Sequence, residues 1–332
     1  MTMAEFSLQE LWAITSYFNP VGYRTRLENY HIFRRYLNIP LLTVELSFHG
    51  CFELSRNDAD ILVQIDEGDV MWQKERLLNI AFQKLPDQCK YVVWLDCDVV
   101  FEREDWLESS VEALHKSMLI QPYSIVYDLK QGTDVSDTLQ GNVLMQRESM
   151  AWKICHGTID FDSTSTSMLG HYSPGHAWAV HRAAVEPSGF YDAMILGSGD
   201  FAMAMAAVEH YDDIVSSYGM HASQAKHYLT WSKKWSQAIN GCIGVVEGGL
   251  RHLWHGHMED RGYDRRYASF KQFAFDPYTD IKVGANGCWC WSSDKSELHE
   301  YCRKYFESRK EDGHQGKSSK RVPPTTSSEP ER

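Results

Sequence analysis

Two carboxylates separated by a single residue are the feature of this sequence best suited to bind a cation. Asp96, Cys97 and Asp98 directly follow the apolar run Tyr91–Leu95. Because residues i and i+2 of an extended segment point the same way, we expect Asp96 and Asp98 to face one divalent ion while Cys97 packs inward. Carboxylate oxygens favour Mg²⁺ or Mn²⁺, and such an ion neutralises the charge that develops on a departing diphosphate. The simpler interpretation is that the triplet only caps a strand that enters a turn.

Short apolar strands and helical segments alternate over the first hundred residues and would position this triplet. The pattern predicts strands at 11–18, 40–46, 59–65 and 91–95, and helices at 23–37 and 72–84. Nearly uniformly apolar strands that alternate with helices are typical of a mostly parallel sheet covered by helices on both faces. Ligands of such sheets bind at the carboxyl ends of the strands, where Asp96 and Asp98 lie. The predicted fold class is therefore α/β.

The rest of the sequence divides less clearly. Residues 111–200 mix polar segments with apolar patches, and their secondary structure is not predicted. We expect one domain over residues 1–307, with a donor half at about 11–110 and an acceptor half at about 111–305. From residue 308 to residue 332 almost no side chain is apolar, which predicts a disordered tail outside the fold.

The composition excludes several classes of function. The chain has 332 residues, of which 45 are acidic and 33 basic, so its net charge of −12 argues against a nucleic-acid partner. No run approaches the roughly 20 apolar residues that span a bilayer, and the first ten residues lack a signal-peptide pattern, so we expect a cytoplasmic protein without a membrane span. The eight cysteines form no CxxC pair, which favours reduced thiols. Cys288, Cys290 and Cys302 could hold zinc, but an i, i+2 spacing is typical of neither zinc knuckles nor redox pairs.

Residues 72–98 resemble the helix and the Asp-x-Asp strand of GT-A glycosyltransferases, including the β-1,4-galactosyltransferases. The block contains the sequence RLLNIAF and, one strand later, VWLDCD. Family 2 glycosyltransferases share the overall plan. The resemblance implies a GT-A, Rossmann-like fold in a single domain.

Two later blocks extend the resemblance to about residues 11–305. Residues 175–200 are similar to the acceptor segment of these transferases, although Gly199-Asp200 stands where the family has Glu-Asp. Residues 253–261, with the sequence LWHGHMEDR, resemble a late segment of family 2 members. In GT-A enzymes a late histidine often completes the metal site.

The resemblance implies a metal-dependent, inverting hexosyltransferase with Mn²⁺ or Mg²⁺ as cofactor. Its donor would be a nucleoside diphosphate sugar, with a UDP-sugar favoured, and its acceptor a hydroxyl of a glycan or another molecule. Asp200 would be the general base that deprotonates the acceptor; the alternative is that Asp200 caps the helix that follows it. Neutral imidazole is a good ligand for Mn²⁺. The implied metal ligands are Asp96, Asp98 and His255, and His252 or His257 could replace His255.

The remaining site residues are carried over from the resemblance by position. The residues placed at the donor are Thr15, Tyr17, Asn19, Arg24, Glu45, Lys74, Asp96 and Cys97. Those placed at the acceptor are Trp178 and Gly199. Guanidinium groups bind phosphate bidentately, so Arg261, Arg265 and Arg266 could close over the donor; each could equally be a solvated surface charge.

Other functions remain compatible with the same residues. A metal-dependent phosphoester hydrolase would also need clustered aspartates and histidines, and Asp96, Asp98 and the segment 252–257 could form a two-metal site. A nucleotidyltransferase shares the α/β plan, but the sequence has no early glycine-rich basic loop for a triphosphate. A non-catalytic module that binds sugar nucleotides is a further alternative, because a fold does not guarantee activity.

Overall fold

A seven-stranded sheet forms the centre of the computed structural model, which describes residues 9–48, 50–161, 172–263 and 265–313. From one edge to the other, the strands are β11 (Ile243–Val245), β6 (Leu119–Gln121), β10 (Ala177–His181), β4 (Tyr91–Leu95), β1 (Leu11–Phe18), β2 (Leu41–Leu46) and β3 (Ile61–Ile65). The pairings of β10 with β4 and with β6 are antiparallel, and the others in this sheet are parallel. The predicted α/β class with a mostly parallel sheet is confirmed.

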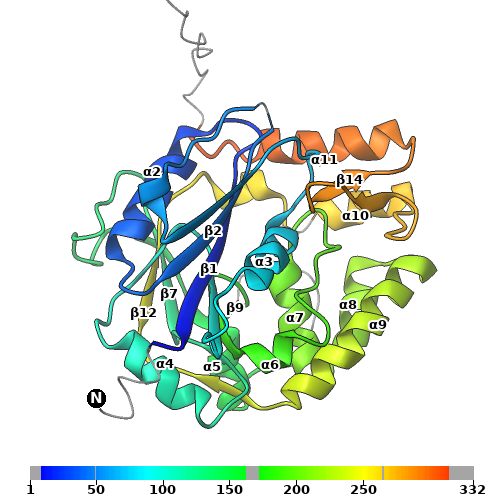
Figure 1. Cartoon of the computed structure of the whole chain (residues 1–332). Coiled ribbons are helices and arrows are strands. Elements are labelled where there is room, and N and C mark those ends of the chain that lie inside the picture. The colour runs from blue at the N-terminus through cyan, green and yellow to red at the C-terminus, as the bar shows by residue number, and fades with distance from the viewer. Residues whose placement is uncertain (1–8, 49, 162–171, 264, 314–332) are drawn as a thin grey trace, which may run out of the picture.

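Side chains of the central strands alternate between two apolar clusters, one on each face of the sheet. On β1, Ile14 and Phe18 belong to the first cluster, whereas Ala13 and Tyr17 belong to the second, as the two-residue period of a strand requires. The helices that contribute to the first cluster include α3 (Lys74–Gln83), α5 (Met150–Cys155), α6 (Arg182–Val185), α7 (Gly199–Ala207) and α9 (Ala222–Ile239). Those of the second are α2 (Arg24–Tyr36) and α4 (Trp106–Leu114). Helices therefore cover both faces, and Figure 1 shows α2 and α3 on opposite sides of β1 and β2.

The six elements predicted before the Asp-x-Asp triplet all form, and their ends lie within two residues of the predicted positions. β1 and β4 are almost completely buried along their length, which accounts for their uniformly apolar sequences. α3 ends at Gln83, shortly before Leu85-Pro86, because a proline disfavours helical backbone in the residue before it. Local sequence patterns were sufficient here because the buried strands are nearly continuous apolar runs and the two helices carry apolar residues at helical spacing.

A second, five-stranded sheet lies beside the first and was not predicted from the sequence. Its order is β5 (Val99–Phe101), β12 (Gly249–His252), β7 (Ile125–Leu129), β8 (Val143–Ser149) and β9 (Tyr172–Ser173). Residues 96–98 leave β4 in the first sheet and enter β5 in the second, and residues 97 and 98 form a turn. The prediction of extended backbone through Asp96–Asp98 is therefore wrong, because the chain changes sheets at this point.

The last part of the described chain combines helices with the antiparallel pair β13–β14 and packs against the first cluster. The remaining elements are η1 (Arg56–Asp58), α8 (Tyr211–Tyr218), η3 (Met258–Arg261), α10 (Arg266–Phe270), η4 (Lys271–Phe273), β13 (Ile281–Val283), β14 (Trp289–Trp291) and α11 (Ser296–Ser308). The predicted tail begins too early, because Arg309 is only 4% exposed and Glu311 only 1%. Nε of Arg309 lies 2.6 Å from Oε1 of Glu311. Because the two charges compensate each other, both side chains can be buried although the segment is polar. Residues 314–332 lie outside the described part of the chain.

Two further observations bear on the composition. Within the described ranges, no helix combines the length and apolar character needed to cross a membrane. All eight cysteines are free thiols. Cys288 and Cys302 are fully buried in the first apolar cluster, so packing accounts for their position.

Candidate functional site

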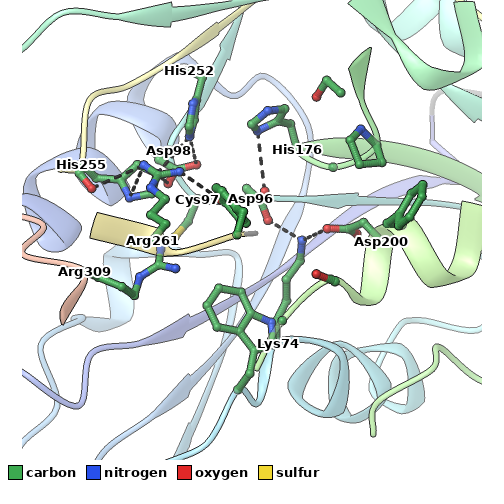
Figure 2. Close-up of a pocket in the computed structure, with 18 of the residues that line it drawn as sticks. Lys74, Asp96, Cys97, Asp98, His176, Asp200, His252, His255, Arg261 and Arg309 are labelled. Carbon is green, nitrogen blue, oxygen red and sulfur yellow. Dashed lines mark hydrogen bonds and ion pairs between the residues drawn. The ribbon is translucent and has the colours of Figure 1, made fainter. Parts of the chain in front are cut away.

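One pocket lies where β1 and β4 end and where the two sheets meet. Its volume is about 1060 Å³, including the open mouth. The predicted site residues that line it are Lys74, Asp96, Cys97, Asp98, Asp200, His255, Arg261 and Arg266. These residues come from segments as far apart as α3 and α10, and the fold brings them into a single cavity (Figure 2).

Lys74 joins two acids at one end of the pocket. Its Nζ lies 2.5 Å from Oδ1 of Asp96 and 2.6 Å from Oδ2 of Asp200, as Figure 2 shows. The Lys74 side chain is only 7% exposed. Burial alone would lower the pKa of Lys74, but the carboxylates of Asp200 and Asp96 hold it well above its usual value. Lys74 is therefore a fixed positive charge between two negative ones.

Asp200 lies in the first turn of α7 but does not cap this helix. The N-cap of α7 is Ser198, whose φ of 76° is left-handed, and Asp200 lies two residues later. Oδ1 of Asp200 accepts a hydrogen bond from Nε1 of Trp94 at 3.1 Å, and Oδ2 accepts one from Lys74. Burial raises the pKa of Asp200 above its usual value, although Lys74 opposes the shift. The carboxylate is thus held in the pocket by side chains rather than by the backbone of α7.

Asp98 meets two histidines at the other end of the pocket. Its Oδ2 lies 3.2 Å from Nε2 of His255, and its Oδ1 lies 3.8 Å from Nε2 of His252. One ligand atom from each of these three residues lies within 4.8 Å of the others. Oδ1 of Asp98 is buried and has no hydrogen-bond partner among the described residues. His252 and His255 are thus grouped with Asp98, and His257 does not line the pocket.

The buried ion pair of Asp128 and Arg147 contacts the ring nitrogen of His252 that faces away from Asp98. Nδ1 of His252 lies 2.6 Å from Oδ1 of Asp128, and Arg147 donates to both oxygens of Asp128, at 3.0 and 2.7 Å. Asp128, Arg147 and His252 come from β7, β8 and β12, so the second sheet builds this arrangement. Asp128 engages Nδ1, so Nε2 is the nitrogen that faces Asp98, and a carboxylate on the second ring nitrogen is usual for metal-bound histidines. No sequence motif pointed to Asp128 or Arg147, because both lie in the segment whose structure was not predicted.

The two histidines have opposite electrostatic surroundings. Burial alone would lower the pKa of His252, but Asp128 and Asp98 raise it above its usual value. Burial is the main cause that lowers the pKa of His255, to about 4, and the positive charge of nearby Arg261 adds to this effect. His255 is therefore neutral near pH 7, which is the form that binds a metal ion.

Four arginines form a basic wall in the same pocket. Arg26, Arg261, Arg266 and Arg309 all line it. The Nε atoms of Arg26, Arg261 and Arg266 are buried and have no hydrogen-bond partner among the described residues. Burial would raise the pKa of Tyr263, but Arg261, Arg309 and Arg266 lower it to about 8. This wall can hold an anion close to the Asp98 end. Arg265 does not line the pocket.

Thr15 and Glu45, which were predicted to lie at the donor, do not line the pocket. Thr15 is fully buried, and its hydroxyl donates to the carbonyl of Leu95 in the neighbouring strand at 2.7 Å. Glu45 accepts hydrogen bonds from the backbone N–H groups of Glu53 and Leu54 at 2.6 and 3.1 Å. Both side chains therefore hold strands and a loop together. Neighbouring Ser16 faces the pocket instead.

Tyr17, Asn19 and Arg24 also do not line the pocket. The hydroxyl of Tyr17 donates to Glu53, and Nδ2 of Asn19 donates to Oε2 of Glu53 at 2.9 Å. The Arg24 side chain is 80% exposed and pairs with Glu28 at 3.5 Å. The structure thus places none of these three predicted donor residues against the cavity.

The two residues predicted to bind the acceptor do not line the pocket. Trp178 is 1% exposed, and its Nε1 donates to the carbonyl of Pro174 at 2.8 Å. Gly199 does not line the pocket; a Cβ atom at this position would lie 2.3 Å from Oε1 of the buried Glu75. A glycine is therefore required for close packing. Trp94, rather than Trp178, is the tryptophan that reaches Asp200.

His176 is a pocket residue that the sequence placed in a motif without assigning a role. It has a left-handed φ of 71°, and its Nδ1 lies 3.8 Å from Oδ2 of Asp96. Its ring centroid lies 4.5 Å from that of His252. Burial lowers the pKa of His176 well below its usual value, so the ring is neutral near pH 7. Cys97 lines the pocket too, and burial raises the pKa of its thiol to about 12, so it stays protonated.

No known protein-family model matches the chain, and no curated protein sequence matches it. Several solved structures are similar. The S. aureus TarS 1-349 structure in complex with UDP-GlcNAc has 10% sequence identity and a TM-score of 0.41, and the match covers 90% of this chain and 72% of that chain. A glucosyl-3-phosphoglycerate synthase from Mycobacterium tuberculosis, in complex with Mn²⁺, UDP and phosphoglyceric acid, has 12% sequence identity and a TM-score of 0.38. That match covers 84% of this chain and 83% of that chain.

A 4-diphosphocytidyl-2C-methyl-D-erythritol synthase from Anaerococcus prevotii is 12% identical with a TM-score of 0.30, and the match covers 72% of this chain and 88% of that chain. TM-scores below 0.5 decide neither the fold family nor the activity. The resemblance to β-1,4-galactosyltransferases and to family 2 therefore stays a prediction.

Proposed function

We propose that this chain is a metal-dependent glycosyltransferase of the GT-A type that uses a nucleoside diphosphate sugar. The observation that carries the proposal is the order of charges along one pocket. A carboxylate with two imidazoles lies beside a wall of arginines, and a buried carboxylate paired with lysine lies at the opposite end. A metal ion, a diphosphate and an acceptor hydroxyl need these three environments in one cavity.

The residues that would hold the metal are Asp98, His252 and His255. Their ligand atoms are close enough to share one ion, and the unpaired buried Oδ1 of Asp98 lacks the partner that a buried carboxylate oxygen needs. A mixed oxygen and nitrogen set suits Mn²⁺ better than Mg²⁺, which prefers oxygen ligands. When bound, the ion would offset the negative charge of the diphosphate. Asp96 is already paired with Lys74, so we assign it to the donor sugar or ribose rather than to the metal.

The basic wall would hold the diphosphate. Guanidinium groups bind phosphate oxygens in pairs, and Arg261 and Arg266 both line the pocket. Arg266 also donates from Nη2 to the hydroxyl of Ser198 at 2.5 Å, two residues before Asp200. The donor's phosphates and the catalytic carboxylate would thus be positioned by one connected set of contacts. A UDP-sugar is the favoured donor.

Asp200 would act as the general base on the acceptor hydroxyl. Burial raises its pKa, which strengthens it as a base, while Lys74 keeps it ionised before reaction. A base that removes the hydroxyl proton allows in-line attack on the anomeric carbon, which inverts its configuration. Lys74 would stabilise the site when Asp200 takes up the proton, because Asp96 then remains as its partner.

A two-metal phosphoester hydrolase fits the pocket less well. A second group of possible ligands, Asp128, His176 and His252, shares His252 with the first. Asp128 is already engaged by Arg147 through both oxygens. A second ion would therefore have to displace a buried ion pair, which is costly.

A thermal-shift screen of UDP-, GDP-, CDP- and dTDP-sugars with and without Mn²⁺ tests the proposal. A ligand that binds only the folded state raises its stability, by about 2.7 kcal/mol at a hundred times its Kd. We expect a shift that requires both the ion and one donor, and that is absent in Asp98→Ala. Release of the nucleoside diphosphate on adding acceptors would distinguish a transferase from a binding module. No metal-dependent shift with any donor would overturn the proposal.

A further inference from the structure

The segment that follows α11 is built into the donor pocket. Arg309 lines the pocket, and Glu311 is 1% exposed directly behind it. Lys310 between them has a left-handed φ of 43°, so the chain turns sharply at this point. In the sequence these residues look like the start of a solvated tail, but their side chains are among the most buried charges of the molecule.

Two contacts anchor this segment to the start of α2. Oδ1 and Oδ2 of Asp312 accept hydrogen bonds from the backbone N–H groups of Thr25 and Arg24, at 2.8 and 3.1 Å. The backbone N–H of Lys310 donates to the hydroxyl of Tyr23 at 3.1 Å. A carboxylate on the free N–H groups of a first helical turn is a favourable cap. The segment is therefore tied to the element that carries Arg26.

The segment also packs closely against the loop that carries His255. A Cβ atom on Gly256 would lie 2.8 Å from the carbonyl oxygen of Arg309, so only glycine allows this approach. Oε1 of Glu311 lies 3.8 Å from Nδ1 of His255. The candidate metal ligand and the segment are thus direct neighbours.

Arg309 is held so that one edge of its guanidinium group stays available. Its Nε donates to Glu311 at 2.6 Å, and its Nη1 donates to the hydroxyl of Tyr305 at 3.0 Å. The guanidinium carbon lies 5.3 Å from the ring centroid of Trp72. Among the described residues, Nη2 of Arg309 has no hydrogen-bond partner. Glu311 also binds Arg26, at 3.0 Å, so one carboxylate orients two arginines of the wall.

We infer that Arg309 binds the diphosphate of the donor directly, and that the segment 309–312 is a wall of the donor site rather than a tail. The inference rests on the proposed function for the identity of the anion. Two observations support it: the fixed guanidinium group in the pocket, and the buried, unpartnered Nε atoms of Arg261 and Arg266 in the same wall. Fixed guanidinium groups lose little freedom on binding phosphate, which makes them strong anion partners.

Isothermal titration of the full chain with Mn²⁺ alone, with inorganic pyrophosphate plus Mn²⁺, and with UDP plus Mn²⁺ tests this inference. We expect Arg309→Gln to bind Mn²⁺ alone as the unmodified chain does, and pyrophosphate and UDP at least about tenfold more weakly, the usual effect of losing one hydrogen bond to a charged group. Arg303→Gln is the matched control, because Arg303 is exposed on α11 and, within the described part of the chain, pairs with Glu300 and Glu307 alone. It should leave all three titrations unchanged.

Arg309→Lys separates a specific contact from net charge and replaces Arg309→Gln if that variant does not fold. Lysine keeps the charge but not the planar fork, so we expect it too to bind pyrophosphate more weakly. Unchanged pyrophosphate affinity in either folded variant would overturn the inference, as would a loss confined to UDP, since Arg309 would then contact the nucleoside. If the unmodified chain binds pyrophosphate through Arg309 but no sugar nucleotide, the inference stands and the proposed function fails.

Discussion

The two acids of one triplet have opposite surroundings. Asp96 follows the last strand residue of β4 in the first sheet and is paired with the ammonium group of Lys74. Asp98 precedes β5 of the second sheet and faces two imidazoles, one of them neutral near pH 7. A divalent cation is attracted most to the carboxylate whose charge is not already compensated. The difference assigns separate tasks to residues that the motif alone treats as equivalent.

Asp98→Ala should have the largest effect on Mn²⁺ affinity, whereas Asp96→Asn should have almost none. Removing Asp98 takes away a direct ligand, so Mn²⁺ affinity should fall by more than the roughly 10–100-fold typical of residues behind the ligands. Asp96→Asn should leave Mn²⁺ affinity nearly unchanged, because Asp96 faces Lys74. Electron paramagnetic resonance of free Mn²⁺ measures both. Equal losses in the two variants would mean that the acids share the ion after all.

Asp200→Asn should remove transfer while leaving donor binding intact. A missing general base typically costs about 10²–10⁴-fold in rate, and the amide keeps the size and one acceptor oxygen of the carboxylate. Single-turnover transfer and UDP titration with Mn²⁺ measure the two effects separately. Normal transfer by this variant would rule out the base role and leave Asp200 as a partner of Lys74 and Trp94 only.

Asp128→Asn tests the contribution of the second sheet. It weakens the hold on His252 without touching the ion, so Mn²⁺ affinity should fall by about 10–100-fold, less than for Asp98→Ala. The exposed Asp87, changed to Asn, is the control. If Mn²⁺ binding by Asp128→Asn is intact, His252 is not a ligand and the metal depends on Asp98 and His255 alone.

Glu75→Gln should give the smallest effect, visible only as a change in pH dependence. Burial raises the pKa of Glu75 to about 8, although Lys74 opposes the shift. Between the usual value near 4.5 and pH 8 the folded state therefore binds more protons than the unfolded state, so this group lowers stability as pH rises. The stability of Glu75→Gln minus that of the unmodified chain should therefore be larger at pH 8 than at pH 5. Urea unfolding at both pH values measures the free energy of unfolding of the variant and of the unmodified chain, and Glu112→Gln, at an exposed position, is the control. The same difference in unfolding free energy at pH 5 and at pH 8 would contradict the prediction.

The sequence predicted the first half of the fold well, for a physical reason. β1, β2 and β4 are short, buried and apolar, and α3 has a clear stop at Leu85-Pro86, so local patterns were sufficient. The same patterns placed the triplet at the carboxyl end of β4 and Lys74 at the first turn of α3. They failed for the second sheet, whose longer strands β7 and β8 are partly exposed and therefore form no continuous apolar run.

Side-chain direction was the part of the site that local reasoning could not supply. The donor residues predicted on β1 and β2 were taken from position, but Thr15 and Glu45 are buried in contacts between strands and a loop. Trp178 was assigned to the acceptor because it lies in a motif, yet it packs in the core. A one-residue change of face in a strand exchanges a pocket residue for a core residue.

By itself, the sequence determined the α/β order, the position of the Asp-x-Asp triplet, and four of the residue types that the pocket combines: aspartate, lysine, histidine and arginine. Only the tertiary structure decided which of them meet. The Lys74–Asp200, Asp128–His252 and Arg26–Glu311 contacts join residues 126, 124 and 285 positions apart. Such pairs depend on how sheets and helices pack, and no local pattern of charge or hydrophobicity encodes them. For that reason Arg309 and Glu311 looked like a tail, whereas the fold makes them part of the pocket.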